Sequence, residues 1–445
     1  MIAEKIHIKE MIGGRYDNSF VLYHHRLSNF KFPCSPLSRF LTDKPQYGAG
    51  EAGIPRESNK SPRYIRITDI DWNGTLDDSL GVTAKTIEDK YILNNNDILI
   101  ARSGNTVGKS YIHKTSTVDE PCFFAGYLIR FIVDSNLVSP DYIFIFTKLS
   151  VYSDWVKVTQ RVTGQPNINA EEYSNLPIPL PSFEVQQQII NIYSQAQQAR
   201  LEKQQEAKRL LDSIDDYLLE ALKIKRVRNT NFNKVSIIQN ISSLLGGRLD
   251  PQQFHQERVE AVEKIKMGNW CRLKDVRYDV KSVSKKIPSG ETYIGMENID
   301  SCTGDYTESK EKEIVSSAAR FKEGDILFPK LRPYLNKVHR AQFDGYCSTE
   351  FHVFEAHDIL PDFLTVVLRS SLTLAQTKHL MTGNTLPRLQ TNDVEDLILP
   401  NPEISKQEEI VIHIYGLKDK AKQLQKEGDA LLEEAKQKIE KMIIG

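Results

Sequence analysis

Residues 182–224 read SFEVQQQIINIYSQAQQARLEKQQEAKRLLDSIDDYLLEALKI, and residues 403–443 read EISKQEEIVIHIYGLKDKAKQLQKEGDALLEEAKQKIEKMI. Neither stretch contains proline, both are rich in charged and amide side chains, and each follows a short run punctuated by prolines. A proline-free polar stretch with regularly spaced apolar residues is typical of an amphipathic helix. The sequence therefore predicts two long helices.

Apolar residues recur in both stretches at alternating steps of four and three residues, which is the coiled-coil period. The seam consists of Ile189, Leu210 and Ile214 in the first stretch and of Ile410, Ile414, Leu417, Leu424 and Leu431 in the second. Arg200 and Lys203 interrupt it in the first stretch. We expect the two helices to pair with each other, because so long a helix overhangs a small domain. The alternative is that each helix packs on its own globule.

Outward from the helices, the chain is a duplicated unit, since five motifs recur in the same order in both halves. GGRYD at 13–17 recurs as GGRLD at 246–250, RYIRITDI at 63–70 as TYIGMENI at 292–299, DIL at 97–99 as DIL at 325–327, VTG at 162–164 as MTG at 381–383, and LPIPLP at 176–181 as LILPNP at 397–402. Such repetition fixes the organisation of the fold before any local detail. Each repeat combines short β-rich runs with turn signals, so we expect two similar mixed α/β globules.

Length and charge limit the functions that this chain can have. At 445 residues it exceeds a single hydrophobic core, and its 40% hydrophobic and 26% charged residues are those of a folded protein. The formal net charge of −1 means that any nucleic-acid binding must come from local basic surfaces. No window approaches the roughly 18 apolar residues of a membrane helix, so we expect a cytoplasmic protein without membrane contact.

Catalytic motifs are missing from the sequence. The run from Gly104 to Ser110, GNTVGKS, resembles a phosphate-binding loop, but only three residues separate its glycines where that loop has four. There is no glycine-rich turn for a dinucleotide or S-adenosylmethionine, and no cluster of metal ligands at a recognisable spacing. We therefore expect a chain that is not an enzyme on its own and binds no cofactor and no metal.

Basic residues recur in windows that lack Asp and Glu. Such windows suit DNA phosphates, because a nearby carboxylate repels the backbone, and Arg or Asn can also contact base edges. The windows follow the two DIL motifs and precede the two proline-punctuated runs. They supply as candidate DNA-binding residues Arg102, Asn105, Lys109, Tyr111 and Arg161 in the first half, and Lys330, Arg332, Tyr334, Lys337 and Arg388 in the second. The alternative interpretation is a solvated basic loop.

The runs DILIARSGNTVGKS at 97–110 and DILFPKLRPYLNKV at 325–338 resemble the target-recognition domains of type I restriction-modification specificity subunits. The runs FEVQQQI at 183–189 and ISKQEEI at 404–410 resemble the start of the conserved helices of that family. The resemblance implies target-recognition domains at 1–181 and 246–402, conserved helices at 182–225 and 403–445, and a linker at 226–245. It also implies that the two helices are antiparallel and hold the domains apart.

The resemblance further implies function and partners. Each domain is expected to read one half of a bipartite double-stranded DNA site. Two methyltransferase subunits, which use S-adenosylmethionine, are expected to dock on the chain, and motor-nuclease subunits, which use ATP and Mg²⁺, to join them. The alternatives are the specificity subunit of a related two-subunit methyltransferase-nuclease system and a coiled-coil scaffold that binds only protein. The base sequence does not follow from the resemblance, since target-recognition domains vary.

Overall fold

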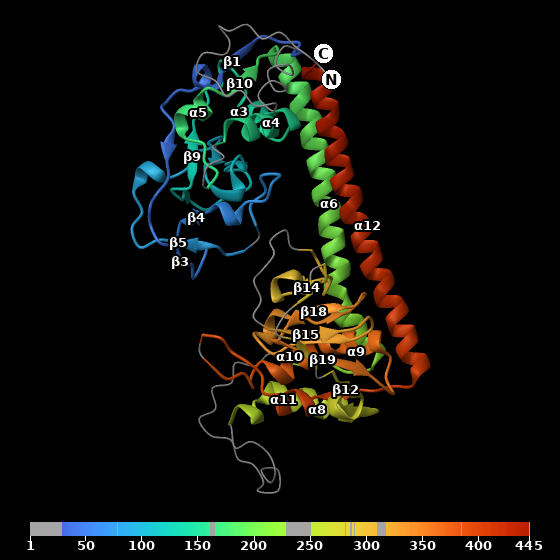
Figure 1. Ribbon diagram of the computed structural model, residues 1–445. Helices are drawn as coiled ribbons and strands as arrows, with labels where there is room; N and C mark the ends of the chain where they lie inside the picture. Colours follow the sequence, from blue (N-terminus) through green and yellow to red (C-terminus); the bar gives the residue numbers. More distant parts are fainter. Residues whose placement is uncertain are drawn as a thin grey trace. The chain divides into compact units, whose positions relative to one another are not determined.

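A computed structural model describes residues 29–77, 79–160, 165–227, 251–280, 282–284, 287–288, 290–308, 317–383 and 385–444 (Figure 1). The chain divides into two compact units, unit 1 with Met1–Glu202 and Glu427–Gly445, and unit 2 with Lys203–Lys426. Both divisions fall inside long helices. The sequence-based boundaries at 181 and 402 stay a prediction, and most of the proposed linker lies outside the described residues.

The elements of unit 1 run in chain order, with 3₁₀ helices labelled η. They are β1 (Cys34–Pro36), η1 (Leu37–Phe40), β2 (Gln46–Tyr47), β3 (Ile54–Pro55), β4 (Arg63–Ile65), η2 (Ile67–Asp69), β5 (Val82–Thr83), η3 (Asp89–Tyr91), β6 (Ile98–Ala101), η4 (Gly104–Thr106), β7 (Ser110–Ile112), β8 (Cys122–Phe124), β9 (Leu128–Phe131), α3 (Pro140–Phe146), α4 (Ser150–Thr159), α5 (Ala170–Ser174) and β10 (Pro177–Pro179). Helix α6 (Phe183–Ala221) follows and passes into unit 2.

Unit 2 repeats this order with small differences. Its elements are η5 (Pro251–Phe254), α8 (Gln256–Lys266), β11 (Trp270–Arg272), η6 (Leu273–Asp275), β12 (Arg277–Asp279), β13 (Val283–Ser284), β14 (Tyr293–Ile294), η7 (Met296–Asn298), β15 (Ala318–Phe321), β16 (Ile326–Pro329), η8 (Pro333–Leu335), β17 (His339–Arg340), β18 (Gly345–Ser348), β19 (Phe351–Ala356), α9 (Pro361–Arg369), α10 (Ser371–Thr377), α11 (Thr391–Glu395) and β20 (Ile398–Pro400). Helix α12 (Ile404–Ile443) returns into unit 1. The predicted mixed α/β class is confirmed.

The main sheet has the same strand order in both units, β2-β9-β6-β7 in unit 1 and β12-β19-β16-β17 in unit 2, and all pairs are antiparallel. The repeated DIL motif begins its inner strand. Ile98 and Leu99 are buried, as are Ile326 and Leu327. A strand covered on both faces has to be continuously apolar, so this part of the motif is structural.

The Asp of the motif closes the turn before that strand. The Asp97 carboxylate accepts the backbone N–H of Asn94 at 2.8 Å, and the Asp325 carboxylate accepts that of Lys322 at 2.8 Å. Short polar side chains stabilise turns by bonding to nearby backbone in this way. The repeat at this point therefore reports the fold and not the ligand.

The second sheet differs between the units. In both, a strand from the motif at 63–70 or 292–299 runs parallel to its neighbour, β4 beside β8 and β14 beside β18. In unit 1 the third strand, β5, pairs with β4, whereas in unit 2 the third strand, β15, pairs with β18. Where unit 2 has the β15–β18 pairing, the described part of unit 1 has only a single bridge, between Ile92 and Phe123. The two globules are thus similar but not superimposable throughout.

Both ends of each long helix pack on a globule. Ile189 and Tyr193 of α6 and Ile439 of α12 belong to the hydrophobic core of unit 1. Leu218 of α6 and Ile410 of α12 belong to that of unit 2. The interpretation in which each helix packs on its globule therefore holds for the helix ends.

Within each unit the two helices lie side by side and antiparallel (Figure 1). In unit 1, Arg200 contacts Gly428, and its Nε donates to the Asp429 carboxylate at 2.8 Å. In unit 2, the ring of Tyr217 stacks on that of His413 with centroids 3.8 Å apart. Later residues of α6 thus face earlier residues of α12.

The predicted seam is correct along most of its length and wrong near the end of α12. Ile189, Ile410, Ile414 and Leu424 are buried and Leu210, Ile214 and Leu417 are partly buried, but Leu431 is 38% exposed and Leu432 only 2%. Beyond Gly428 the buried positions include Leu432, Ala435 and Ile439, so that Leu432 replaces Leu431. The steps from Leu424 to Gly428 and from Gly428 to Leu432 are both four residues long. Two consecutive steps of four are a stutter, which locally unwinds a coiled coil.

A buried glutamine near the start of each long helix ties it to a shorter one. Gln186 accepts the backbone N–H of Ser139, at the start of α3, at 2.9 Å, and Gln407 accepts that of Leu360, at the start of α9, at 2.8 Å. Their amide groups also donate to the carbonyls of prolines just before their own helices. Among the helices described, none is long and apolar enough to span a membrane.

Candidate nucleic-acid interface

The two acid-free windows of unit 1 meet at the end of strand β6. The Gly104 backbone N–H donates to the Pro166 carbonyl at 2.9 Å, and the Ile168 N–H donates to the Arg102 carbonyl at 2.9 Å. These bonds join the loop after β6 to the segment before α5. One continuous surface therefore carries both windows.

Unit 2 builds the same junction at the end of β16. The Arg332 N–H donates to the Pro387 carbonyl at 2.9 Å, and the Leu389 N–H donates to the Lys330 carbonyl at 3.0 Å. Lys330 thus takes the place of Arg102, and Arg332 that of Gly104. We call each pair of joined segments the reading loops of its unit: 102–109 with 165–168, and 330–337 with 385–389.

Left-handed backbone explains the apparent phosphate-binding loop. Gly104 and Gly108 have φ of 72° and 87°, and the equivalent Arg332 and Asn336 have φ of 47° and 54°. Glycine adopts such values freely, whereas a residue with a side chain is strained there. The glycines of GNTVGKS therefore serve the shape of the loop.

The reading loops of unit 1 expose polar and aromatic side chains without an acid partner among the described residues. Arg102 lies with its guanidinium 4.8 Å from the centre of the Tyr47 ring, and its Nε is buried without a hydrogen-bond partner. Asn105 is exposed at the tip. Tyr127, which directly precedes β9 and lies beside the loop, is 62% exposed. Guanidinium, amide and aromatic groups at one edge are those that contact bases and sugars.

The reading loops of unit 2 carry different side chains on the same backbone. The guanidinium of Arg332 donates to the Thr385 carbonyl, at 3.5 Å, and its Nε is also buried without a partner in the described part of the chain. Tyr334 is 48% exposed. Arg388 is held by two 2.9 Å bonds to the Glu350 carboxylate. The surface is therefore less purely basic than the sequence windows suggested, because Glu350 comes from outside them.

The repeated lysines have a structural role and do not reach outward as predicted. Lys109 Nζ donates to the carbonyls of Ile70 at 2.7 Å and Ile67 at 3.3 Å, and Lys337 Nζ donates to that of Met296 at 2.7 Å. Ile67 and Met296 are the first residues of η2 and η7. Burial lowers the pKa of Lys109. Lys109 lies between β6 and β7, and Lys337 lies between β16 and β17. Each lysine therefore ties a 3₁₀ helix to the hairpin that these strands form. This internal role removes the reason to expect phosphate contacts from them.

Three further predicted positions need correction or stay open. Tyr111 is only 4% exposed, and its hydroxyl lies 3.1 Å from Nδ1 of His113, so it cannot pack on DNA. Lys330 Nζ is half-buried and donates to the Thr349 carbonyl at 2.8 Å, and burial lowers its pKa. Arg161 lies outside the described residues.

Comparisons with known proteins find similar specificity subunits. Residues 59–211 match the family model described as the type I restriction modification DNA specificity domain. The specificity subunit of the type I restriction enzyme EcoDI from Escherichia coli is 23% identical over 342 residues, covering 72% of this chain and 70% of that protein. That of MjaVIII from Methanocaldococcus jannaschii is 22% identical over 394 residues, covering 86% and 84%. The chain is thus similar to type I specificity subunits over most of its length.

A solved structure of a type I S subunit is similar in extent. The crystal structure of the type I restriction-modification S subunit from M. genitalium aligns over 94% of this chain and 97% of that chain, with a TM-score of 0.40 and 13% identity. The residues matched by the family model include the reading loops of unit 1.

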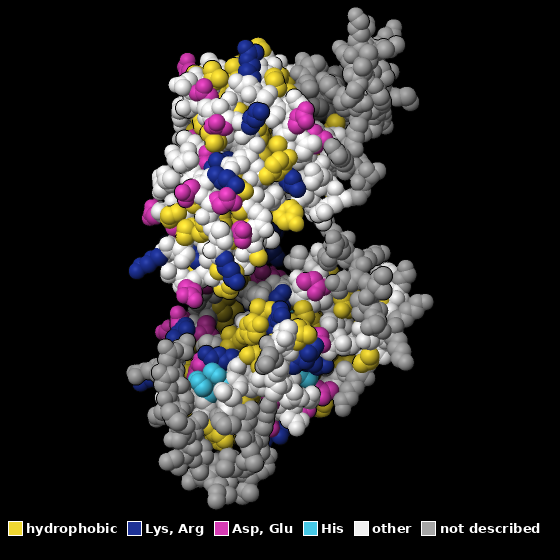
Figure 2. All heavy atoms as spheres, turned by 90° about the vertical axis from the view of Figure 1, so that its left-hand side faces the viewer, with side chains coloured by type: hydrophobic (Ala, Val, Ile, Leu, Met, Phe, Trp, Pro, Cys, Tyr) yellow, Lys and Arg dark blue, Asp and Glu magenta, His cyan; other side chains and the backbone are white. Residues whose placement is uncertain are grey.

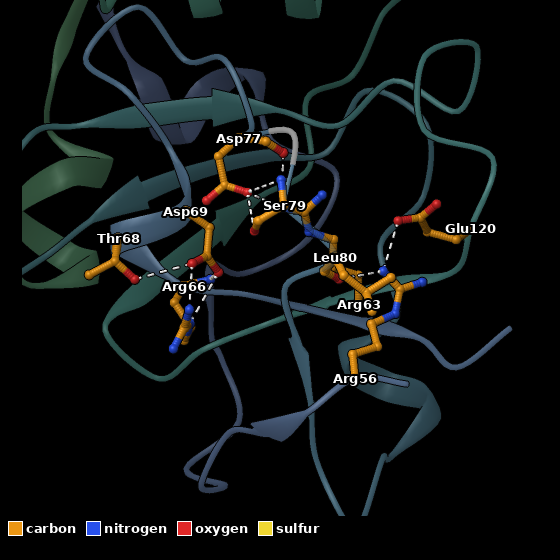
Figure 3. Close-up of polar contacts among 9 residues, drawn as sticks. All are labelled: Arg56, Arg63, Arg66, Thr68, Asp69, Asp77, Ser79, Leu80 and Glu120. Carbon is orange, nitrogen blue, oxygen red and sulfur yellow. Dashed lines mark hydrogen bonds and ion pairs between the residues drawn. The ribbon is translucent and has the colours of Figure 1, made fainter. Parts of the chain in front are cut away.

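Arginines in the stretch 56–66 of this chain are neutralised internally (Figure 3). Arg56 donates to Glu120 at 3.0 Å and to three backbone carbonyls. Arg63 donates to Asp77 at 2.6 Å, and Arg66 forms a two-pronged pair with Asp69 at 2.7 and 3.1 Å. These cations hold the loops around β4 together. On the face drawn in Figure 2, basic and acidic side chains are likewise interspersed.

A half-buried cation that the sequence did not single out fastens a turn in each unit. Lys148 Nζ donates to the carbonyls of Trp72 at 3.3 Å and Ser110 at 2.8 Å, and Arg369 donates to those of Ser301 at 3.0 Å and Cys302 at 2.8 Å. Burial lowers the pKa of Lys148 to about 7 and that of Arg369 to about 10. Counting along the repeat aligns them, because 369 − 148 equals 397 − 176.

Among the described residues, one cluster has metal-ligand types, namely His255, Glu257 and His379. The two rings are stacked with centroids 3.5 Å apart and planes 16° from parallel. Lone pairs lie in the ring planes, so nearly parallel stacked rings do not converge on one ion. Lys378 also places its ammonium 2.6 Å from the Glu257 carboxylate. The arrangement is that of an ion-pair cluster.

Proposed function

We propose that this chain is a specificity subunit that reads a bipartite double-stranded DNA site, one half with the reading loops of each unit. The observation that carries the proposal is the pair of junctions: the same backbone bonds hold the same two segments in both units, while the exposed side chains differ. A shared backbone with different side chains is what two domains need in order to dock alike and read different bases.

The chain acts as the non-catalytic, DNA-reading part of a methyltransferase and endonuclease complex. Methyltransferase subunits, in two copies, bring S-adenosylmethionine, and motor-nuclease subunits bring ATP and Mg²⁺. The purified chain alone is expected to leave DNA unmethylated and uncleaved. The match to the DNA specificity domain model and the similarity to two specificity subunits support this role, and they favour DNA reading over a scaffold that binds only protein.

The helix pair sets the separation of the half-sites in this proposal. Helices α6 and α12 contain 39 and 40 residues. At about 1.5 Å per residue each extends for roughly 60 Å. Their antiparallel pairing within both units supports a role as a ruler made of the coiled coil between two target-recognition domains.

Selection of binding sequences from a random DNA pool, with the chain assembled on its methyltransferase, tests the proposal. Arg102→Ala is expected to relax base preference in one half-site and Arg332→Ala in the other. The penalty is roughly 1–3 kcal/mol if each contacts a guanine through two hydrogen bonds. Exposed arginines outside the loops, Arg39 and Arg320, supply matched Ala controls.

The outcomes separate independent reading from other arrangements. If either loop substitution relaxed both half-sites equally in an assembled complex, reading by two independent units would be wrong. If the Arg39→Ala control changed base preference as strongly as Arg102→Ala, the reading loops would not be the interface.

A further inference from the structure

One backbone position beside the reading loops is equivalent in the two units although simple alignment does not pair it. In unit 1 the Arg102 N–H donates to the Tyr127 carbonyl at 3.0 Å, and in unit 2 the Lys330 N–H donates to the Glu350 carbonyl at 2.8 Å. Tyr127 directly precedes β9 and Glu350 directly precedes β19. The two residues therefore stand at the same place next to the loop.

The side chains at this position are chemically opposite. Tyr127 has an exposed aromatic ring. Glu350 has a carboxylate that receives both Nε and a terminal nitrogen of Arg388. Arg388 is itself fixed by backbone bridges to Leu331 in the reading loop and to Thr382. The pair is thus anchored to the loop at both ends.

A carboxylate on this surface is otherwise unfavourable, because it repels DNA phosphates. The paired guanidinium neutralises it, and the hydrogen bond from Arg388 lowers the pKa of Glu350, which keeps it ionised. An ionised carboxylate offers about four acceptor sites and a guanidinium about five donors. After two bonds between them, the pair still presents acceptors beside donors.

We propose that Tyr127 and Glu350 occupy one specificity-determining position, and that Glu350 with Arg388 reads a cytosine·guanine pair while Tyr127 contacts a thymine methyl group. In the major groove cytosine presents an amino donor and guanine two acceptors, which match the carboxylate and the guanidinium. Apolar side chains contact the thymine methyl. This inference rests on the proposed function and adds the base class to it.

A purely structural pair is the competing explanation. In that case Glu350 only holds Arg388, and its loss loosens the 385–389 segment and weakens binding to every sequence alike. A base-reading pair instead changes the preference at one position. The distribution of the effect over sequence therefore separates the two, even where overall affinity falls in both.

The test is sequence selection with the full chain assembled on its methyltransferase, comparing wild type, Glu350→Ala, Arg388→Ala and Tyr127→Ala. Glu350→Ala and Arg388→Ala are expected to lower the preference for the cytosine·guanine pair at the same single position, by roughly 5- to 150-fold. Tyr127→Ala is expected to relax one thymine in the other half-site. Glu323→Ala, an exposed acid of unit 2, is the matched control.

Each result decides the proposal. Loss of affinity that is uniform over sequence in Glu350→Ala, or altered preference in the half-site read by unit 1, overturns the role of Glu350. An unchanged thymine preference in Tyr127→Ala overturns that of Tyr127. If the wild-type complex selects no bipartite sequence at all, the proposed function itself fails, which is a different outcome from either.

Discussion

Arg332 adopts a backbone conformation that its side chain disfavours, and the repeat shows how easily the strain could be avoided. The equivalent residue of unit 1 is Gly104, which has the same left-handed conformation without a Cβ. A left-handed residue with a side chain costs roughly 1–2 kcal/mol. Strain that the fold itself does not require clusters at functional sites. The strain therefore supports the role proposed for the Arg332 side chain in DNA reading.

Arg332→Gly is expected to stabilise unit 2 and to weaken DNA reading. Relief of strain outweighs the greater freedom of glycine in the unfolded chain, so the gain is up to about 1 kcal/mol. Urea unfolding measures the first effect and sequence selection the second. Gly104→Ala in unit 1 is the mirror control and should destabilise. Loss of stability in Arg332→Gly would contradict the strain argument.

His352 gives unit 2 a dependence on acid pH. Burial, with the nearby Lys330 and Arg277, lowers its pKa from 6.5 to about 3. Between these values the unfolded chain binds the proton and the folded chain does not, so stability is complete above pH 6.5 and falls as the pH drops. His352→Gln should flatten the fall in unfolding free energy between about pH 6.5 and about pH 4.

The exposed His413 supplies the control, since His413→Gln should leave that slope as it is. Hydrogen exchange of β19 amides assigns the change to unit 2. An equally steep slope in His352→Gln would show that other groups cause the acid sensitivity.

At this scale the sequence identified repeated positions better than their roles. Lys109 and Lys337 do align, but their partners are carbonyls in and beside η2 and η7, which are distant in sequence and carry no side-chain signal. Arg102 and Arg332 remain candidates. Glu350 was missed because an acid-free window describes only one segment, whereas a surface combines several.

The helices show which part of a periodic pattern is reliable. The apolar spacing predicted both helices and most buried positions from Ile189 to Leu424. It failed at Leu431, because the last turns of α12 pack on the core of unit 1 and not only on α6. A heptad rule describes a pair of helices, and a third surface moves the buried stripe. The heptad rule alone does not distinguish which of the adjacent Leu431 and Leu432 is buried.

Leu432→Ala and Leu431→Ala therefore form a matched pair. Removing the buried Leu432 side chain should cost about 2–5 kcal/mol of unfolding free energy through lost burial and the cavity left behind. Removing the exposed Leu431 side chain should change it by less than about 0.5 kcal/mol. Urea unfolding followed by circular dichroism measures both. Equal costs would restore the uninterrupted heptad.

At the scale of the whole molecule, the two repeats make equivalent contacts between their long helices. Arg200 contacts Gly428 in unit 1, and Ala207 shares a buried cluster with Ala421 in unit 2. The repeat offset is the same for both, since 421 − 200 and 428 − 207 each equal 221. Equivalent positions thus make both contacts with the roles of the helices reversed. A duplicated sequence predicts this much, but not the different third strands of the second sheets, which lie outside the shared motifs.

Shortening both helices tests the ruler at the scale of the whole molecule. Deleting 201–207 from α6 and 421–427 from α12 removes facing segments, because 201 + 427 and 207 + 421 both equal 628. The loss of about seven residues shortens each helix by about 10 Å and rotates its remaining part by about 20°. Since DNA rises about 3.4 Å per base pair, the spacer between half-sites should shrink by about three base pairs while the half-sites persist.

The control is the deletion of 421–427 from α12 alone. It shifts the residues of one helix relative to their partners on the other, and it should abolish assembly or binding. Sequence selection with the methyltransferase complex reads spacer and half-sites together. A matched double deletion that folds, assembles and still selects the original spacer would refute the ruler. It would leave the reading loops intact, because they lie on the globules and not on the deleted segments.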